Sequence, residues 1–199
     1  MRKHVLIPQN IPKGRITEIF GDVDVGKSST VLKIIGTLTD KTCLYIDTDR
    51  DLTQQKLTEF DIDDMVTVLQ PDTIEQTVDI TNKFLEHGVF DILVIDSTAN
   101  MISEKYKKLP VDQISWKQRV ADITKFIKQL IPVIEKKDMI AIFVSQIRKD
   151  LNDNSYTTGG KALRFYSTVR INVSADDITV VKNKTDKTLL RTMITVREV

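Results

Sequence analysis

Cysteine and histidine are scarce in this chain of 199 residues. Cys43 is the only cysteine, which excludes an intramolecular disulfide and is typical of proteins kept in a reducing compartment such as the cytoplasm. It lies in an apolar run, so we expect a buried small hydrophobic residue. The two histidines, His4 and His87, stand apart and have no second ligand at metal-binding spacing, which argues against a zinc site.

Long apolar runs and a surplus of one charge are also lacking. No run reaches the length of a membrane-spanning helix, and the N-terminus lacks the apolar core of a signal peptide. The formal net charge is only +1, so any nucleic-acid site must be a local patch. Hydrophobic residues make up 41% of the chain, which is enough to build one domain with a full core.

The stretch Gly21–Ser28 fits the phosphate-binding loop pattern G-x-x-x-x-G-K-[ST]. Its glycines let backbone amides point at an anion, its lysine reaches the β- and γ-phosphates, and its serine binds Mg²⁺. A strand-like alternation precedes the loop and helical spacing follows it, as the motif requires. We therefore predict ATP binding by Gly21, Asp22, Val23, Asp24, Val25, Gly26, Lys27, Ser28 and Ser29. The alternative is a glycine-bearing turn that happens to carry a lysine.

An apolar strand at 90–96 ends in a carboxylate, Asp96. Such a strand is typical of the middle of a parallel sheet, where ligands bind beyond the carboxyl ends of the strands. We expect Asp96 to hold Mg²⁺ together with Ser28. The alternative, an aspartate that caps the next turn, would be favoured without the upstream phosphate loop.

Strands alternate with helices along most of the chain, and a run of strands follows. This order predicts an α/β fold with a mostly parallel twisted sheet, flanking helices and antiparallel C-terminal edge strands. An N-terminal arm at 1–14 precedes a single core domain at 15–199. Strands are predicted at 15–20, 43–47, 66–69, 90–96, 139–144, 164–173, 178–184 and 189–196. Helices are predicted from 27 to about 35, at 52–60, from 73 to Gly88, and from 116 to 134, and 147–161 is predicted to be irregular.

Two polar stretches after predicted strands carry basic residues. Loops with lysine, arginine and glycine amides can follow a phosphate backbone without reading its sequence. The candidates are Lys105, Lys107 and Lys108 in the first stretch, and Arg148, Lys149, Gly159, Gly160, Lys161 and Arg164 around the second. The alternative is ordinary solvated charge, which composition alone favours.

Six segments, in chain order, resemble the ATPase core of the RecA recombinase family. They are 11–21, 45–49, 94–97, 143–148, 158–166 and 180–184. The resemblance implies a RecA-like ATPase core that binds ATP and Mg²⁺ between subunits assembled head to tail in a filament or ring. It also implies single-stranded DNA as a partner, with the basic residues named above binding DNA, and a role in recombination through strand exchange or annealing.

The resemblance also assigns roles to single residues. Asp49 occupies the place of the family's catalytic carboxylate, and Gln146 that of the glutamine that senses the γ-phosphate. Lys182 and Lys184 resemble the lysines that reach the nucleotide of a neighbouring subunit. Because they are two apart on a predicted strand, they project to the same face.

The chain departs from the family in several ways. Family members usually have glutamate where this chain has Asp49, and the shorter side chain predicts slow hydrolysis. Residues 52–56 offer no aromatic or arginine to stack on adenine, and the second loop is short with one aromatic, Tyr156. The chain most resembles compact, core-only relatives, including phage-encoded recombinases and annealing proteins, which work in the host cytoplasm.

Two other functions remain open from the sequence. One is an accessory or regulatory ATPase that binds ATP and a protein partner without pairing DNA strands, which Asp49 and the short second loop favour. The other is a small-molecule kinase, against which the chain shows no arginine-rich lid segment.

Overall fold

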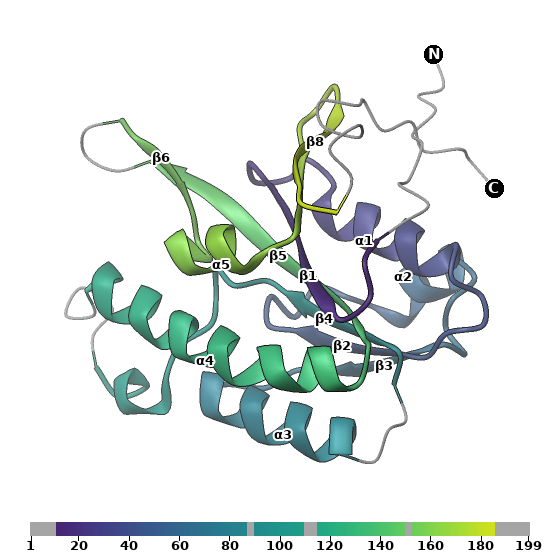
Figure 1. Cartoon of the computed structure of the whole chain (residues 1–199), viewed down its shortest axis with the longest axis horizontal. Helices are drawn as coiled ribbons and strands as arrows, with labels where there is room; N and C mark the ends of the chain where they lie inside the picture. Colours follow the sequence, from purple (N-terminus) through teal and green to yellow (C-terminus); the bar gives the residue numbers. More distant parts are fainter. Residues whose placement is uncertain (1–10, 87–89, 110–114, 150–152, 186–199) are drawn as a thin grey trace.

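The structure is a computed structural model that describes residues 11–86, 90–109, 115–149 and 153–185. Figure 1 shows a twisted sheet with helices on both faces. The strands are β1 Arg15–Gly21, β2 Cys43–Asp47, β3 Val66–Leu69, β4 Ile92–Asp96, β5 Ile140–Lys149, β6 Ser155–Thr157, β7 Val169–Val173 and β8 Ile178–Asn183. The helices are α1 Lys27–Gly36, α2 Gln54–Glu59, α3 Ile74–Glu86, α4 Trp116–Lys136 and α5 Gly160–Tyr166, with a 3₁₀ turn at Glu104–Tyr106.

The sheet has the strand order β3-β2-β4-β5-β1-β7-β8, and β6 pairs with the end of β5. Every pairing from β3 through β7 is parallel, whereas β8 runs antiparallel to β7 and β6 antiparallel to β5. The predicted class, a mostly parallel sheet with antiparallel edge strands, is confirmed. The carboxyl ends of β1, β2, β4 and β5 meet at one edge, which is where such sheets bind ligands.

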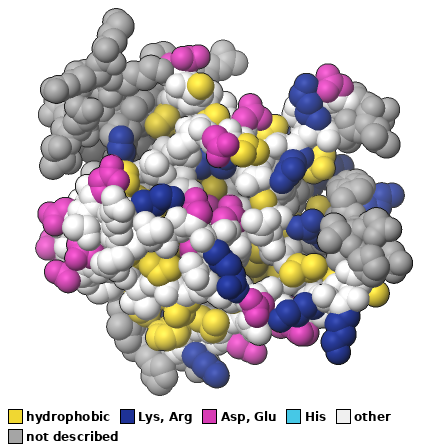
Figure 2. Space-filling view, turned by 180° about the vertical axis from the view of Figure 1, so that it is seen from behind, with side chains coloured by type: hydrophobic (Ala, Val, Ile, Leu, Met, Phe, Trp, Pro, Cys, Tyr) yellow, Lys and Arg dark blue, Asp and Glu magenta, His cyan; other side chains and the backbone are white. Residues whose placement is uncertain are grey.

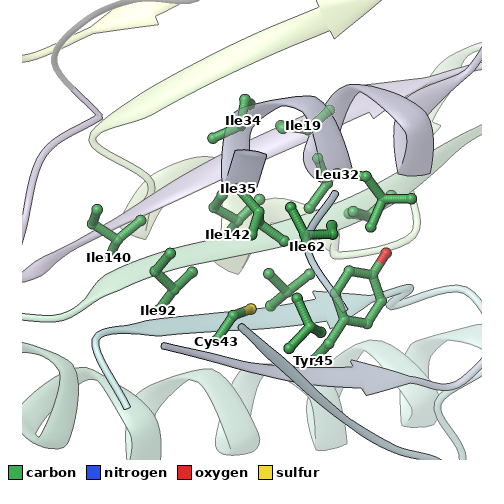
Figure 3. Packing of buried hydrophobic residues seen from close by; sticks show 14 of the residues in the cluster. Ile19, Leu32, Ile34, Ile35, Cys43, Tyr45, Ile62, Ile92, Ile140 and Ile142 are labelled. Atoms are coloured by element: carbon green, nitrogen blue, oxygen red, sulfur yellow. The ribbon is translucent and has the colours of Figure 1, made fainter. Parts of the chain in front are cut away.

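Apolar side chains alternate between two cores, one on each face of the sheet. In β4, Ile92 and Val94 face α1 and α2, while Leu93 and Ile95 face α3, α4 and α5. Figure 3 shows the first of these cores, where α1 packs over the central strands. Strands buried on both faces need continuous apolar runs, and this explains the sequence pattern at 92–96.

The flanking helices begin close to the predicted positions. Thr73 caps α3, since its hydroxyl accepts a hydrogen bond from the backbone of Gln76 at 3.2 Å. Ser115 and Gln118 form a reciprocal capping box at the start of α4. The apolar side of α4 is buried in the second core, where Ile123, Phe126, Ile127, Leu130 and Ile134 lie.

The segment 147–166 differs from its prediction. It was expected to be irregular to residue 161 and a strand from residue 164, but β5 continues to Lys149, β6 pairs with it, and α5 occupies Gly160–Tyr166. The helix forms because Leu163 is fully buried and Ser167 donates its hydroxyl to the Leu163 carbonyl at 2.6 Å. Only the part from Val169 onward is a strand.

Some predictions lie outside the described residues: most of the N-terminal arm, the helix end at Gly88, and the strand at 189–196. Among the helices that the structure describes, none combines the length and the apolar character needed to cross a membrane.

Candidate functional site

The phosphate loop lies between β1 and α1, at the ligand-binding edge of the sheet. A Cβ on Gly21 would come within 2.0 Å of the Val173 carbonyl oxygen, so β1 can meet β7 there only with glycine. Gly26 has a φ of +86° and caps α1, and a Cβ there would meet nothing within 4 Å. Gly26 is therefore required by its backbone conformation, and the space above it is open, as a phosphate cradle demands.

Lys27 is the first residue of α1 and folds back over the loop. Its amine donates to the Asp22 carbonyl oxygen at 2.5 Å. Burial lowers the pKa of Lys27, while Asp96, Asp24, Asp49 and Asp22 act in the opposite direction. Asp22 and Asp24 are exposed, so their carboxylates have room to point away from an anion that they would otherwise repel.

The predicted magnesium pair, Ser28 and Asp96, is brought together. Tyr45 donates its hydroxyl to Asp96 Oδ2 at 2.5 Å, and the Ser28 side chain lies close enough to the Asp96 carboxylate to affect its pKa. Burial raises the pKa of Asp96 to about 6, against the opposing effects of Tyr45 and Ser28. A buried carboxylate beside a serine hydroxyl and the phosphate loop is the oxygen donor set that suits Mg²⁺, so these residues fit the ion.

Asp49 lies in the turn after β2 and faces the turn after β4. The Ser97 hydroxyl lies 3.0 Å from both Asp49 carboxylate oxygens, and the Asn100 amide donates to Oδ1 at 2.9 Å. Asp49 thus lies at the same edge of the sheet as the phosphate loop. Its carboxylate accepts these hydrogen bonds from the neutral side chains of Ser97 and Asn100.

Asp47 fixes the turn that carries Asp49. It is almost fully buried and accepts hydrogen bonds from the backbones of Arg50 and Leu52 and from the Gln70 side chain. Sequence reasoning assigned no role to Asp47, Tyr45, Ser97 or Asn100. The cluster Asp47-Thr48-Asp49 and the serine next to Asp96 were the available signals, but the contacts depend on the register of β2 against β4.

Gln146 lies on β5 directly opposite Gly21 of the phosphate loop. Its backbone exchanges hydrogen bonds with Thr158, and its side-chain oxygen accepts from Arg148 at 2.9 Å. Beyond it, the ends of β5 and β6 form an antiparallel ribbon that projects from the body of the molecule in Figure 1. Gln146 therefore stands at the base of the ribbon and beside the phosphate loop.

The basic candidates of the second stretch lie on the ribbon and on α5. Arg148, Lys149, Lys161 and Arg164 are exposed, and Lys149 pairs with the exposed Asp153 at 2.9 Å. Gly159 is buried, and a Cβ there would come within 2.4 Å of the Leu163 side chain. Gly160 has a φ of +66°, so these two glycines serve packing and backbone geometry at the start of α5.

The first basic stretch is largely paired with carboxylates. Lys105 donates to Asp122 at 2.8 Å and Lys107 to Asp72 at 3.3 Å, while Lys108 is exposed. Figure 2 shows basic and acidic side chains interspersed over one face, among the residues that the structure describes. Any nucleic-acid contact must therefore depend on local groups such as the ribbon.

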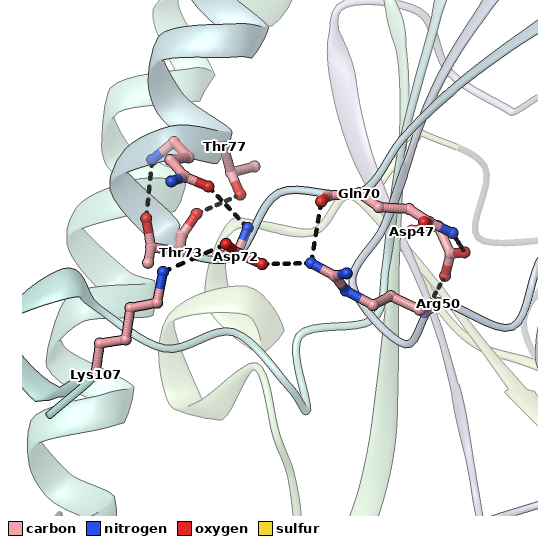
Figure 4. A network of polar contacts seen from close by, with 8 residues as sticks. Asp47, Arg50, Gln70, Asp72, Thr73, Thr77 and Lys107 are labelled. Atoms are coloured by element: carbon pink, nitrogen blue, oxygen red, sulfur yellow. Dashed lines mark hydrogen bonds and ion pairs between the residues drawn. The ribbon is translucent and has the colours of Figure 1, made fainter. Parts of the chain in front are cut away.

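Asp72 bridges two basic side chains from different segments. It pairs with Arg50 as well as Lys107, and Figure 4 shows it lying between them. Arg50 also reaches the Gln70 carbonyl oxygen. A pocket of about 140 Å³ opens here, next to Asp49, and is lined by Thr48, Arg50, Pro71, Asp72, Thr73, Thr77, Asn100 and Met101.

Lys182 and Lys184 converge on the end of α5. Lys182 donates to the carbonyl oxygens of Arg164 and Phe165, and Lys184 donates to that of Phe165 at 3.1 Å. Burial, with Lys184 and Arg170 nearby, lowers the pKa of Lys182 to about 8. Within one chain these lysines thus contact α5, and the exposed Phe165 ring lies beside Lys184.

Comparisons with known proteins by family profile and by sequence identity both find RecA. The sequence profile of the RecA N-terminal domain family matches residues 5–198. Protein RecA of Rickettsia canadensis (strain McKiel) is 31% identical over 196 residues, which is 87% of this chain and 57% of that protein. Protein RecA of Ureaplasma parvum serovar 3 (strain ATCC 27815 / 27 / NCTC 11736) is 30% identical over 193 residues, 93% of this chain and 57% of that protein. The chain thus spans less than three fifths of the length of these curated relatives.

Proposed function

The chain belongs to the RecA family, and on that premise we propose that it is an ATP-dependent, single-stranded-DNA-binding core that acts in DNA recombination and repair by strand exchange or annealing. The observation that carries this proposal is the pairing of Gly21 with Gln146. It joins the phosphate loop to the strand that continues into the β5–β6 ribbon. A conformational change at the nucleotide can therefore be transmitted over a short distance to the segment proposed to bind DNA.

The nucleotide site uses the residues of the phosphate loop. The backbone of Gly21–Ser29 surrounds the phosphates of ATP, and Lys27 leaves the Asp22 carbonyl to contact them. Ser28 and Asp96 would hold Mg²⁺, which would neutralise charge on the phosphates. Asp49 accepts a proton from the water that attacks the γ-phosphate, while Ser97 and Asn100 orient its carboxylate.

The ribbon is the proposed DNA contact and Gln146 is its link to ATP. In this structure the Arg148 side chain donates a hydrogen bond to the Gln146 side-chain oxygen. A γ-phosphate that draws Gln146 toward itself releases Arg148 for a DNA phosphate. Lys149, Lys161 and Arg164 add exposed positive charge nearby, and Lys108 adds it on the first stretch.

We further propose that the subunits assemble head to tail, with Lys182 and Lys184 completing the ATP site of the next subunit. Their amines, held at the end of α5, present two charges at one place on the surface. Cys43, the single cysteine, is a free and buried thiol. A free thiol suits a protein that works in a reducing compartment, such as the cytoplasm of a cell or of a phage host.

An accessory ATPase remains the second candidate. The observation that favours it is the pairing of Lys105 with Asp122 and of Lys107 with Asp72, which leaves little free charge on the first basic stretch. Such a protein would bind ATP and a protein partner without pairing DNA strands.

ATP hydrolysis measured with and without single-stranded DNA separates the candidates. We expect slow hydrolysis that DNA stimulates several-fold, and that disappears in Lys27→Ala but persists in Lys33→Ala, a matched change at the other end of α1. Hydrolysis that DNA leaves unchanged would favour the accessory ATPase. Consumption of ATP only with a small-molecule acceptor would favour a kinase.

A further inference from the structure

Tyr45 has a buried ring and a hydroxyl with one polar partner in the magnesium site. The residue is 1% exposed and belongs to the core between the sheet and α1. Figure 3 shows its ring among isoleucines of that core, with the oxygen at the far end from the backbone. The hydroxyl donates to Asp96 Oδ2 at 2.5 Å.

Packing alone does not account for this hydroxyl. Phenylalanine would fill the same apolar space, and burying a hydroxyl is unfavourable unless it finds a hydrogen-bond partner. The register of β2 against β4 places Tyr45 beside Val94, so its ring reaches along the sheet to the carboxylate two residues further on. A phenol is a proton donor at neutral pH, and its bond to a carboxylate is charge-assisted.

We propose that Tyr45 is a positioning residue that orients the Asp96 carboxylate for Mg²⁺. The inference rests on the proposed ATP site. Tyr45 holds Oδ2 and leaves the other carboxylate oxygen to face the ion. Ser28 also lies close to Asp96, but the Tyr45 hydroxyl is the group that donates to Oδ2. Groups that orient a metal ligand in this way typically contribute about 10- to 100-fold to metal affinity.

The test is the Mg²⁺ dependence of nucleotide binding in Tyr45→Phe. The probe is a fluorescent, non-hydrolysable ATP analogue, titrated at a series of Mg²⁺ concentrations and also in excess chelator. We expect the half-saturating Mg²⁺ concentration to rise about tenfold, while affinity in chelator stays at the parental value. Tyr106→Phe, a matched change in a buried tyrosine of the 3₁₀ turn, should leave both quantities unchanged.

A second comparison tests whether Tyr45 acts through Asp96. In an Asp96→Asn background, Tyr45→Phe should cause no further change in the Mg²⁺ dependence. Equal Mg²⁺ dependence in the parent and Tyr45→Phe would overturn the role of Tyr45 alone. An equal loss of affinity with and without Mg²⁺ would overturn it too, because it would show a packing effect. A parent chain that binds no nucleotide under any condition would overturn both this inference and the proposed ATP site.

Discussion

Asp49 is predicted to stand where the RecA family usually has a catalytic glutamate. Aspartate ends one methylene short of glutamate, and in this structure both of its oxygens lie 3.0 Å from the Ser97 hydroxyl. We expect Asp49→Glu to raise kcat roughly tenfold or more, since a base at hydrogen-bond distance from water accelerates proton transfer. Single-turnover hydrolysis measures this, with ATP affinity as the control. An equal or lower rate at unchanged affinity would remove Asp49 from that role.

Lys182 gives a pH-dependent prediction for stability. Its pKa in the folded chain, about 8, lies below the ordinary lysine value of 10.5. The unfolded chain therefore binds more protons between these values, and Lys182 makes the folded state gain stability as pH rises from 8 toward 10.5. Lys182→Met, which cannot titrate, should lack this gain. Urea unfolding at pH 7 and pH 9.5 checks the difference, and a parallel pH dependence in the two proteins would contradict the shifted pKa.

Among single residues, Lys27 and Ser28 were predicted from the phosphate-loop motif, and Asp96 was predicted from its place at the end of an apolar strand. Lys27, Ser28 and Asp96 lie together because the motif places two of them on one loop and parallel strands end at one edge. The supporting residues Tyr45 and Ser97 could not be predicted. Their contacts cross from β2 to β4 and depend on a register that local sequence does not specify.

At the scale of elements, α5 shows how tertiary packing overrides local sequence preference. A strand was predicted from residue 164 to 173, yet Leu163 is buried within α5, which continues to Tyr166. The Gly159–Gly160 pair at the start of α5 was interpreted as part of a flexible loop. Each glycine in fact meets a geometric demand that the sequence alone does not reveal.

Gly159 allows a test of that packing. A Cβ at this position would lie 2.4 Å from Leu163 Cδ2 and 3.0 Å from Ser145 Oγ, both buried. We expect Gly159→Ala to lower the free energy of unfolding by about 1–3 kcal/mol, as overpacking does. Gly36→Ala is the matched control, because its Cβ would meet its neighbours at 3.5 Å or more and the residue is helical. Equal denaturant midpoints for the two variants would contradict the packing of α5.

At the scale of the whole molecule, the alternation of strands and helices was sufficient to predict the fold. Continuous apolar runs in β4 and β5 indicate central parallel strands, and the order of the elements limits how they can connect. The β5–β6 ribbon was missed because its pairing joins two short polar segments that carry no apolar alternation.

The proposed assembly predicts complementation between variants. Lys182→Ala with Lys184→Ala keeps the phosphate loop, and Lys27→Ala keeps both lysines. If each ATP site is shared between subunits, mixing the two proteins should restore hydrolysis above that of either alone. If the lysines only bond the carbonyls at the end of α5, the double variant keeps its own hydrolysis and mixing raises it at no ratio. Light scattering confirms that both variants still assemble.

The central claim is that ATP controls DNA binding through Gln146 and the ribbon. Fluorescence anisotropy of labelled single-stranded DNA at low salt tests it, with and without a non-hydrolysable ATP analogue. We predict that the analogue tightens binding about 5- to 150-fold, the usual range of coupling between two sites, and that added salt weakens binding. Reversing charge at Arg148 and Lys149 should abolish the tightening, whereas reversing the exposed Lys125 and Lys128 of α4 should preserve it. Absence of binding, or equal affinity with and without the analogue, would contradict the account.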